Sequence, residues 1–342
     1  MRLPLSWLLA FTTAALALLL LGSLATGPMT LTLGESLRAL FAGQESGIAS
    51  HKLLIVQEIR LPRTLLCIAV GGILGLCGAV MQGLFRNPLA DPGIIGVSGG
   101  AALGAALAIV LLAPLGQQLQ ATIGVGLLPL LAFLGGALTT TLVYLLGTRE
   151  GGTSVTVMLL AGVAITALSG AVIGLLTYLA DDQMLRNLSL WQMGTLAAGK
   201  PADVALALLT LAALLWLFMR DANPLNALLL GEGEARHLGV NVQSLKRRLI
   251  LLTAAGVGVA VAVSGMIGFV GLVVPHLVRL LAGPNHVRLL PLSALLGAAL
   301  LLAADMLART LLAPAELPVG IITALLGAPF FIWLLVKGRR AL

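Results

Sequence analysis

Three arginines have the residue type and the spacing to bind carboxylate groups. Arg60 and Arg63 flank Pro62 at the start of a long apolar stretch, and Arg309 lies four residues after Asp305 near the end of another. Guanidinium groups bind carboxylates through strong, often paired hydrogen bonds. We therefore predict that the three arginines form a ring at the outer end of the molecule that docks an acidic partner. For Arg60 and Arg63 the alternative is that they only extend their charged ends to lipid headgroups.

The other reactive residue types show no pattern typical of catalysis or metal binding. The four histidines are scattered without ligand spacing, and no nucleophile with its base can be recognised. The segment GTLAAGK at 194–200 has the spacing of a phosphate-binding loop, but Pro201 replaces the Ser or Thr that would hold magnesium. We expect no catalytic residue, no metal site and no cofactor bound by this chain.

The composition is that of an integral membrane protein. Of the 342 residues, 59% are hydrophobic and 10% charged, whereas a soluble domain has about 25% charged residues. Apolar runs of about 20 residues, enough to cross a bilayer as a helix, recur along the chain. They do not alternate with polar residues as barrel strands do. The expected fold class is therefore all-α, with one transmembrane domain over residues 1–342.

The apolar runs predict ten spanning helices with both termini cytoplasmic. They lie near 5–25, 60–85, 93–113, 123–146, 154–179, 203–219, 249–267, 268–282, 289–312 and 318–336. Most of the 20 Lys and Arg residues then fall on the cytoplasmic side, as the positive-inside rule requires. Gly265 and Gly268 are expected to separate the seventh and eighth runs. The first run could instead be a cleaved signal peptide, although it is long for one.

Two further patterns concern organisation. Gly78–Pro88 and Gly265–Pro275 each contain a Gly, nine residues and a Pro, which hints at an internal pseudo-repeat of the kind common in transporters. The net charge of +7 comes from residues in short loops rather than from one patch, so it indicates membrane topology and not nucleic-acid binding.

Two polar segments are predicted on the cytoplasmic side. In RNPLADPGIIGVSGG, which starts at Arg86, two X-Pro pairs disfavour helix and predict an irregular turn. Residues 221–248 form a longer loop with a predicted amphipathic helix, followed by a basic anchor at 246–248. This helix could lie on lipid, but Glu232 and Glu234 fit poorly against anionic headgroups, so a protein partner is the preferred interpretation.

Five motifs together resemble one known family over nearly the whole chain. They are RLPRTL, GAVMQGLFRNPLADPGIIGVSGGA, LGEGEARHLGV, GFVGLVVPHLVRLL and AELPVGIITALLGAPFFIWLL. These motifs resemble the permeases of bacterial ABC importers for iron chelates, haem and vitamin B12. The resemblance implies a homodimer of ten-helix subunits in the bacterial inner membrane. It also implies two cytoplasmic ATPase subunits that carry ATP and Mg, and a periplasmic binding protein.

The resemblance also implies roles for individual residues. The ring of Arg60, Arg63 and Arg309 would meet acidic residues of the binding protein. The residues that would sit in a cleft of the ATPase are Gly231, Glu232, Ala235, Arg236, Leu238 and Gly239. A cytoplasmic gate would involve Asn87, Leu89, Ser154, Val155 and Thr156, although Val155 is apolar where hydroxyl residues can occur.

The outer segment DDQMLRNLSLWQMG resembles haem permeases more than vitamin B12 permeases. The predicted function is therefore import of an iron chelate, haem, by alternating access, with ferric-siderophore or vitamin B12 import as the alternative. An ion-coupled secondary transporter is a third interpretation. It would need an ionisable relay near the middle of the membrane, and the sequence offers no clear candidate.

Overall fold

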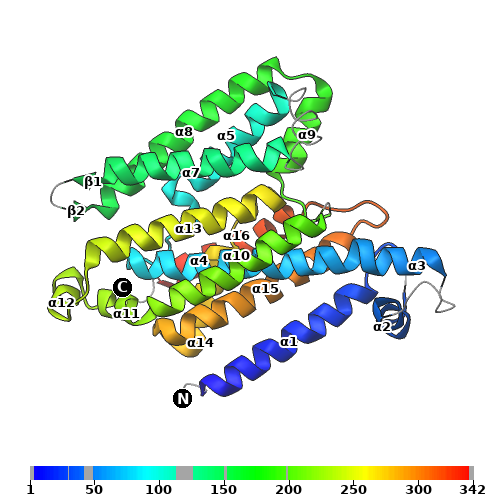
Figure 1. Cartoon of the computed structure of the whole chain (residues 1–342), viewed down its shortest axis with the longest axis horizontal. Coiled ribbons are helices and arrows are strands. Elements are labelled where there is room, and N and C mark those ends of the chain that lie inside the picture. Colours follow the sequence, from blue (N-terminus) through cyan, green and yellow to red (C-terminus); the bar gives the residue numbers. More distant parts are fainter. Residues whose placement is uncertain are drawn as a thin grey trace.

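The apolar runs fold into long helices, which Figure 1 follows along the chain. The structure is a computed structural model that describes residues 4–29, 31–41, 49–112, 126–149, 152–197 and 199–338. Within these residues, seven helical paths are long and apolar enough to cross a membrane. They are α1 (Leu5–Ala25), the path Ser50–Leu84 that ends in α4 (Leu61–Leu84), α7 (Leu127–Gly147), α8 (Val155–Leu179), α10 (Pro201–Arg220), α13 (Val242–Ser264) and α15 (His286–Thr310). The predicted all-α membrane fold is confirmed.

Three further apolar helices occupy the places of the other predicted spans. They are α5 (Val97–Val110), α14 (Val270–Ala282) and α16 (Val319–Gly338). At about 1.5 Å per residue, the 14 residues of α5 extend about 21 Å, less than a hydrocarbon core of about 30 Å. The count of ten crossings therefore stays a prediction.

Irregular backbone shortens two of these helices. The predicted start of the third span at residue 93 is wrong, because a 3-10 turn, η2 (Pro92–Ile95), is followed by Gly96 in a left-handed conformation with φ +86°. The predicted break between the seventh and eighth spans is confirmed. There α13 ends at Gly265 with φ +69°, and α14 begins after Phe269 with φ +68°.

The helical path Ser50–Leu84 corrects the predicted position of Arg60 and Arg63. The sequence places them at the start of a helix, but α3 (Ser50–Leu54) and the π-helical η1 (Ile55–Arg60) run into α4 without a break. In η1 the N–H of Leu61 donates to the carbonyl of Val56, five residues back. This wider turn accommodates the following proline, which has no N–H to donate.

The centre of the bundle is α4, which is buried along nearly its whole length. Its glycines allow close contact with two helices. A Cβ at Gly71 would collide with the Gly297 carbonyl of α15, and a Cβ at Gly78 would collide with Gly271 of α14. Small residues let membrane helices approach closely enough for their backbones to pack. The same device joins α5 to α7, where Gly104 meets the Leu131 carbonyl.

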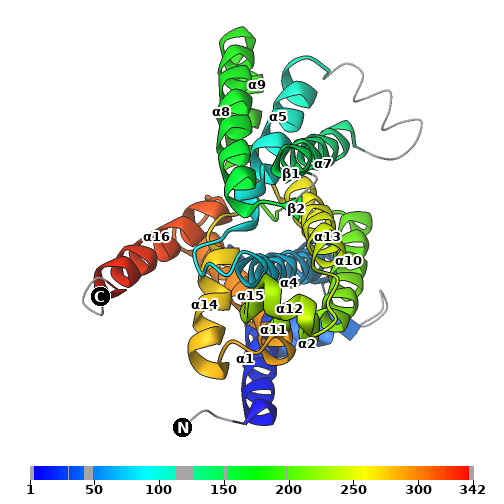
Figure 2. The ribbon, with the colours of Figure 1, turned by 90° about the vertical axis from the view of Figure 1, so that its left-hand side faces the viewer.

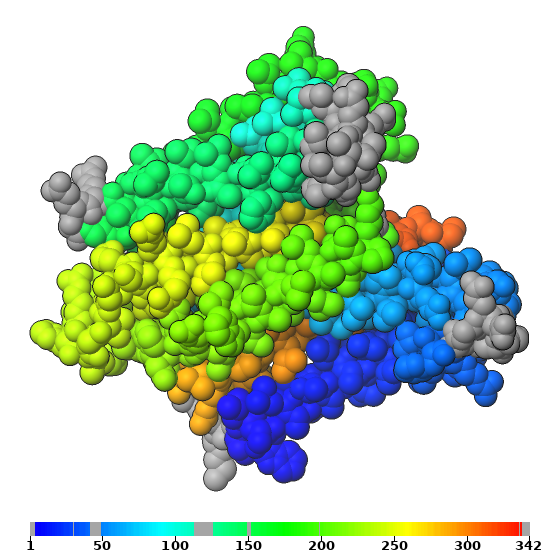
Figure 3. Space-filling view, viewed as in Figure 1, coloured from blue at the N-terminus to red at the C-terminus, as the bar shows by residue number. Residues whose placement is uncertain are grey.

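The helices form layers on either side of this centre. Figures 1 and 2 show α5, α7 and α8 together on one side, next to α13, and α1 on the opposite side along α15. In the space-filling view, α13 fills the surface between α7 and α10, so the layers are in contact along their lengths (Figure 3).

Short elements cover the two ends of the bundle. One end carries α2 (Leu33–Phe41) and α9 (Asp182–Gln192), the latter inside a stretch that the sequence shows only as polar. The other end carries α11 (Ala222–Leu229), α12 (Glu232–His237) and a hairpin of β1 (Thr148–Arg149) and β2 (Gly152–Thr153). The start of α1 lies at this second end (Figure 1). Following the predicted orientation, we call it the cytoplasmic end and the first the outer end.

The predicted cytoplasmic loop 221–248 is partly wrong. It contains α11 and α12 in place of one amphipathic helix, and its basic anchor at 246–248 belongs to the first turns of α13. The reason is the helix cap at Asn241. The Asn241 side chain accepts a hydrogen bond from the Ser244 N–H at 3.1 Å, which starts α13 at Val242.

Candidate functional sites at the two ends of the bundle

Charged side chains are buried at the outer end, between α4, α15 and the turn before α16. Arg63 donates from Nε to Asp305 Oδ1 at 2.9 Å and from Nη1 to Glu316 Oε2 at 2.7 Å. Arg309 Nε lies 3.0 Å from Asp305 Oδ2, one helical turn away on α15. Asp305 is fully buried, so two guanidinium groups compensate its charge. We call Arg60, Arg63, Asp305, Arg309 and Glu316 the outer charge cluster.

The cluster also binds the end of α1. Arg60 Nη1 donates to the carbonyls of Leu24 at 2.7 Å and Ala25 at 2.9 Å. Arg309 donates to the Thr26 carbonyl at 3.1 Å and to the Ser23 hydroxyl at 2.8 Å. The last carbonyls of a helix lack partners within the helix and carry its negative dipole end, so cations are favoured there.

Burial changes the interpretation of the predicted arginine ring. Arg60, Arg63 and Arg309 are only 4%, 6% and 3% exposed, so the alternative in which Arg60 and Arg63 extend to lipid headgroups is wrong. Docking of an acidic partner stays a prediction, and it would require that partner to compete with contacts inside the protomer. Of the two carboxylates, Glu316 reaches the surface, with 35% of its side chain exposed. The sequence does not predict the bond between Glu316 and Arg63, because it does not show which helix Glu316 faces.

The α11–α12 turn forms the main feature of the cytoplasmic end. Gly231 separates the two helices with φ +120°, and Gly239 ends the turn after α12 with φ +82°. Ala235 is completely buried and fixes α12 to the bundle. Leu230 and Leu238 are 67% and 64% exposed on either side of α12. We call residues 230–239 the coupling surface, because exposed leucines beside charged residues are suited to a protein partner.

The predicted coupling residues Glu232 and Arg236 belong to an ion-pair network. Glu232 accepts from the Lys246 ammonium at 2.6 Å and lies 3.8 Å from Arg236, which is exposed. The same ammonium donates to the Thr153 carbonyl at 3.0 Å. Lys246 was predicted only as part of a basic anchor, yet its side chain is 3% exposed.

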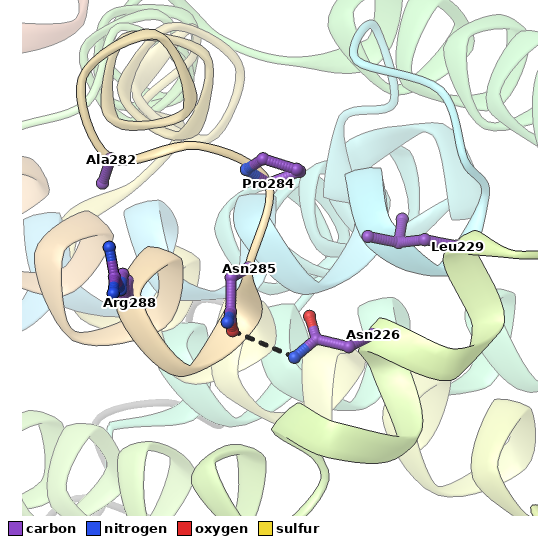
Figure 4. Close-up of a pocket in the computed structure, with 6 residues that line it drawn as sticks. All are labelled: Asn226, Leu229, Ala282, Pro284, Asn285 and Arg288. Carbon is purple, nitrogen blue, oxygen red and sulfur yellow. Dashed lines mark hydrogen bonds between the residues drawn. The ribbon is translucent and has the colours of Figure 1, made fainter. Parts of the chain in front are cut away.

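Two surface hollows lie at the cytoplasmic end. One, of about 460 Å³, lies between α11 and the corner that joins α14 to α15. Figure 4 shows six residues that line it: the Asn226 amide donates to Asn285 Oδ1 at 3.0 Å, and Leu229, Ala282, Pro284 and Arg288 form the rest. The other hollow, of about 440 Å³, lies between Gly152 and the residues 239–243 that lead into α13.

A third, smaller hollow of about 70 Å³ lies inside the bundle, where the two irregular segments meet. Its lining includes Asp91, Gly93 and Ser98 from the segment before and into α5, and Gly268 from the break before α14. The Asp91 carboxylate accepts a hydrogen bond from the Gly93 N–H at 2.7 Å. Asp91, which the sequence predicts in an irregular cytoplasmic turn, borders this hollow.

The predicted gate residues fall into two groups. Asn87 and Leu89 lie in the turn after α4, where Asn87 Oδ1 accepts from the Leu89 N–H at 2.9 Å. Ser154 is exposed and caps α8 with its hydroxyl, and Val155 and Thr156 form the first turn of α8. No hydrogen bond or ion pair between the two groups occurs in the part of the chain that the structure describes, so the gate stays a prediction.

Within the described ranges, no group of three or more His, Cys, Asp or Glu side chains could hold a metal ion. The chemistry that the residues do support is charge recognition at both ends of a bundle of apolar helices. Fold and sites together are those of a multi-pass α-helical membrane protein with charged sites at both ends.

The chain belongs to the FecCD transport family, whose model matches residues 15–337. It is 47% identical over 336 residues to the hemin transport system permease protein HmuU of Yersinia pestis, covering 97% of this chain and 96% of that one. It is 44% identical over 297 residues to the cobalamin import system permease protein BtuC of Halobacterium salinarum, covering 87% of this chain and 77% of the other. A solved metal-chelate type ABC transporter in an inward-facing conformation superimposes with a TM-score of 0.82. It is 34% identical, and the match covers 97% of this chain and 99% of that chain.

Proposed function

We propose that this chain is the permease subunit of an ATP-binding-cassette importer that moves an iron chelate, haem, into the cytoplasm by alternating access. The observation that carries the proposal is the similarity, over 97% of the chain, to a hemin permease. The membrane-spanning helices and the similarity to a metal-chelate transporter support the same class. The chain itself would not be an enzyme, because ATP and Mg would bind to separate ATPase subunits.

In this proposal a homodimer of the permease binds two ATPase subunits at its cytoplasmic end. The coupling surface supports this assignment, because Leu230 and Leu238 offer apolar contacts and Glu232 and Arg236 offer charges next to them. ATP-driven closure of the ATPases would displace α12 and shift the permease between inward-open and outward-open states. Such a shift requires that the partner binds one state more tightly than the other.

At the outer end, a periplasmic binding protein would deliver the cargo. The outer charge cluster contains three arginines and two carboxylates, so it holds an excess of positive charge. Arg60 has only carbonyl partners among the described residues. An acidic side chain of the binding protein would be a stronger partner for it than these carbonyls, which supports the docking role.

The test is uptake into proteoliposomes that contain this chain with its ATPase and binding protein. Haem, a ferric siderophore and vitamin B12 are compared, and an ATPase variant that cannot hydrolyse ATP serves as control. We expect haem uptake only with active ATPase and binding protein. If only vitamin B12 or only the siderophore is taken up, that ligand and not haem is the cargo. Uptake that persists without ATP and stops with an uncoupler would favour a secondary transporter.

A further inference from the structure

Lys246 stands between the coupling surface and the start of α8. We propose that it is a positioning residue that transmits the displacement of α12 to the gate segment 154–156, through the carbonyl of Thr153. The inference rests on the proposed function, because it needs an ATPase that displaces α12. It adds to that function a specific mechanical route through the permease.

The first step of the route joins α12 to α13. The Lys246 ammonium is bound by Glu232 Oε1 at 2.6 Å, and no other carboxylate of the described residues lies within 4.0 Å of it. Because the Lys246 side chain is 3% exposed, water cannot replace Glu232 without opening the packing around it. A buried charge that loses its partner is strongly unfavourable. A movement of Glu232 is therefore expected to carry Lys246 with it.

The second step joins α13 to the hairpin. Lys246 donates to the Thr153 carbonyl at 3.0 Å, and Gln243, one turn earlier on α13, accepts from the Thr153 N–H at 3.1 Å. Both backbone groups of Thr153 are thus bound by α13, and Thr153 is 6% exposed. The hairpin is therefore fixed to α13 at its second strand.

The third step joins the hairpin to α8. Ser154 follows Thr153 directly, its N–H donates to the Gly147 carbonyl at 2.8 Å, and its hydroxyl caps α8. Across the hairpin, the Thr148 and Thr153 hydroxyls are 3.1 Å apart and hydrogen-bonded. These contacts make β1, β2 and the first turn of α8 one unit. A displacement at Thr153 therefore reaches the predicted gate residues within one to three positions.

The chain supplies a matched control in the next residue. Arg247 is exposed, carries the same charge on the same turn of α13, and makes no hydrogen bond or ion pair to another residue that the structure describes. Lys246→Met removes the ammonium but keeps an unbranched apolar side chain. Arg247→Met removes an equal charge without touching the route.

The experiment uses the whole complex with its binding protein in proteoliposomes, and measures ATP hydrolysis and cargo uptake together. For Lys246→Met we expect hydrolysis within twofold of the unmodified complex and uptake per ATP lowered at least tenfold. Arg247→Met is expected to retain both. If Lys246→Met imports cargo as efficiently per ATP as Arg247→Met, the proposal is overturned. If the unmodified complex shows no ATP-dependent uptake, the proposed function fails first.

A second measurement separates transmission from simple stabilisation. One spin label is placed at Gly233 on α12 or at Val157 on α8, so that the homodimer carries two copies. The distance between the two copies shows how far that helix moves when ATP binds. Both positions are exposed. In Lys246→Met we expect the α12 distance to change as before and the α8 distance to stay constant. Equal movement of α8 with and without Lys246 would refute the route. If Lys246→Met does not fold, Lys246→Leu, which also replaces the ammonium by an apolar side chain, repeats the test with the same expected and refuting results.

Discussion

Replacing Asp305 by Asn should destabilise the permease more than any other isosteric change in the outer charge cluster. Asp305 is fully buried and bound by Arg63 at 2.9 Å and by Arg309 at 3.0 Å. Removing one partner of a buried ion pair costs about 3–5 kcal/mol. Arg63 retains Glu316 and Arg309 retains the end of α1, so the lower value, about 3 kcal/mol, applies. At roughly 2 °C per kcal/mol for a large chain, the melting temperature should fall by about 6 °C.

The chain contains its own reporter for this measurement. Cys67 and Cys77 are buried free thiols, so a thiol-reactive dye becomes fluorescent as the protein unfolds in detergent or nanodiscs. Glu316→Gln is the matched control: its carboxylate binds the same Arg63, but its side chain is 35% exposed, so about 1 kcal/mol or less is expected. A melting temperature of Asp305→Asn within 1 °C of Glu316→Gln would refute the reasoning.

Three further results are expected. Gly71→Val should prevent stable folding, because its side chain would collide with a backbone carbonyl of α15, whereas Gly170→Val, with open space around it, should melt like the unmodified protein. Leu238→Glu should weaken copurification of the ATPase at least tenfold without changing the melting temperature, because Leu238 is 64% exposed; an unchanged yield of ATPase would contradict its place in the coupling surface. Hydrogen bonds from Lys52 and from the backbone lower the pKa of Glu35 to about 2. The stability that comes from this depressed pKa is fully present above the unfolded value of 4.5 and is lost as pH falls from there toward about 2. Intrinsic-corrected hydrogen exchange of α2 should therefore be the same at pH 7 and pH 6 and faster at pH 3; faster exchange already at pH 6 would argue against the pair.

Local patterns explain which parts of the fold could be predicted. A span of about 20 apolar residues is required by the bilayer and is visible without knowing its neighbours. The break at Gly265 could be predicted because glycine tolerates positive φ. The start of α13 was misplaced because its cap, Asn241, precedes a polar and basic turn that looks like a loop.

The contacts in the sites also divide into those that local spacing predicts and those between residues far apart in the sequence. The pair of Asp305 and Arg309 spans one helical turn, so spacing alone predicts it. The bond from Arg63 to Asp305 joins residues 242 positions apart, and no periodicity encodes it. The larger error was to expect the arginines at the surface, because exposed and buried arginines look alike in sequence. Only the assembled helices show that Arg60 and Arg309 are buried and bind the end of α1.

The small hollow beside Asp91 has a consequence for water inside the protein. Backbone that is not helical can exist within a membrane only where protein or water satisfies its polar groups. At about 30 Å³ per molecule, the hollow of about 70 Å³ has room for about two waters next to the carboxylate. The two helix breaks that line this hollow therefore have a place where water could satisfy backbone polar groups, which the straight spans around them do not need.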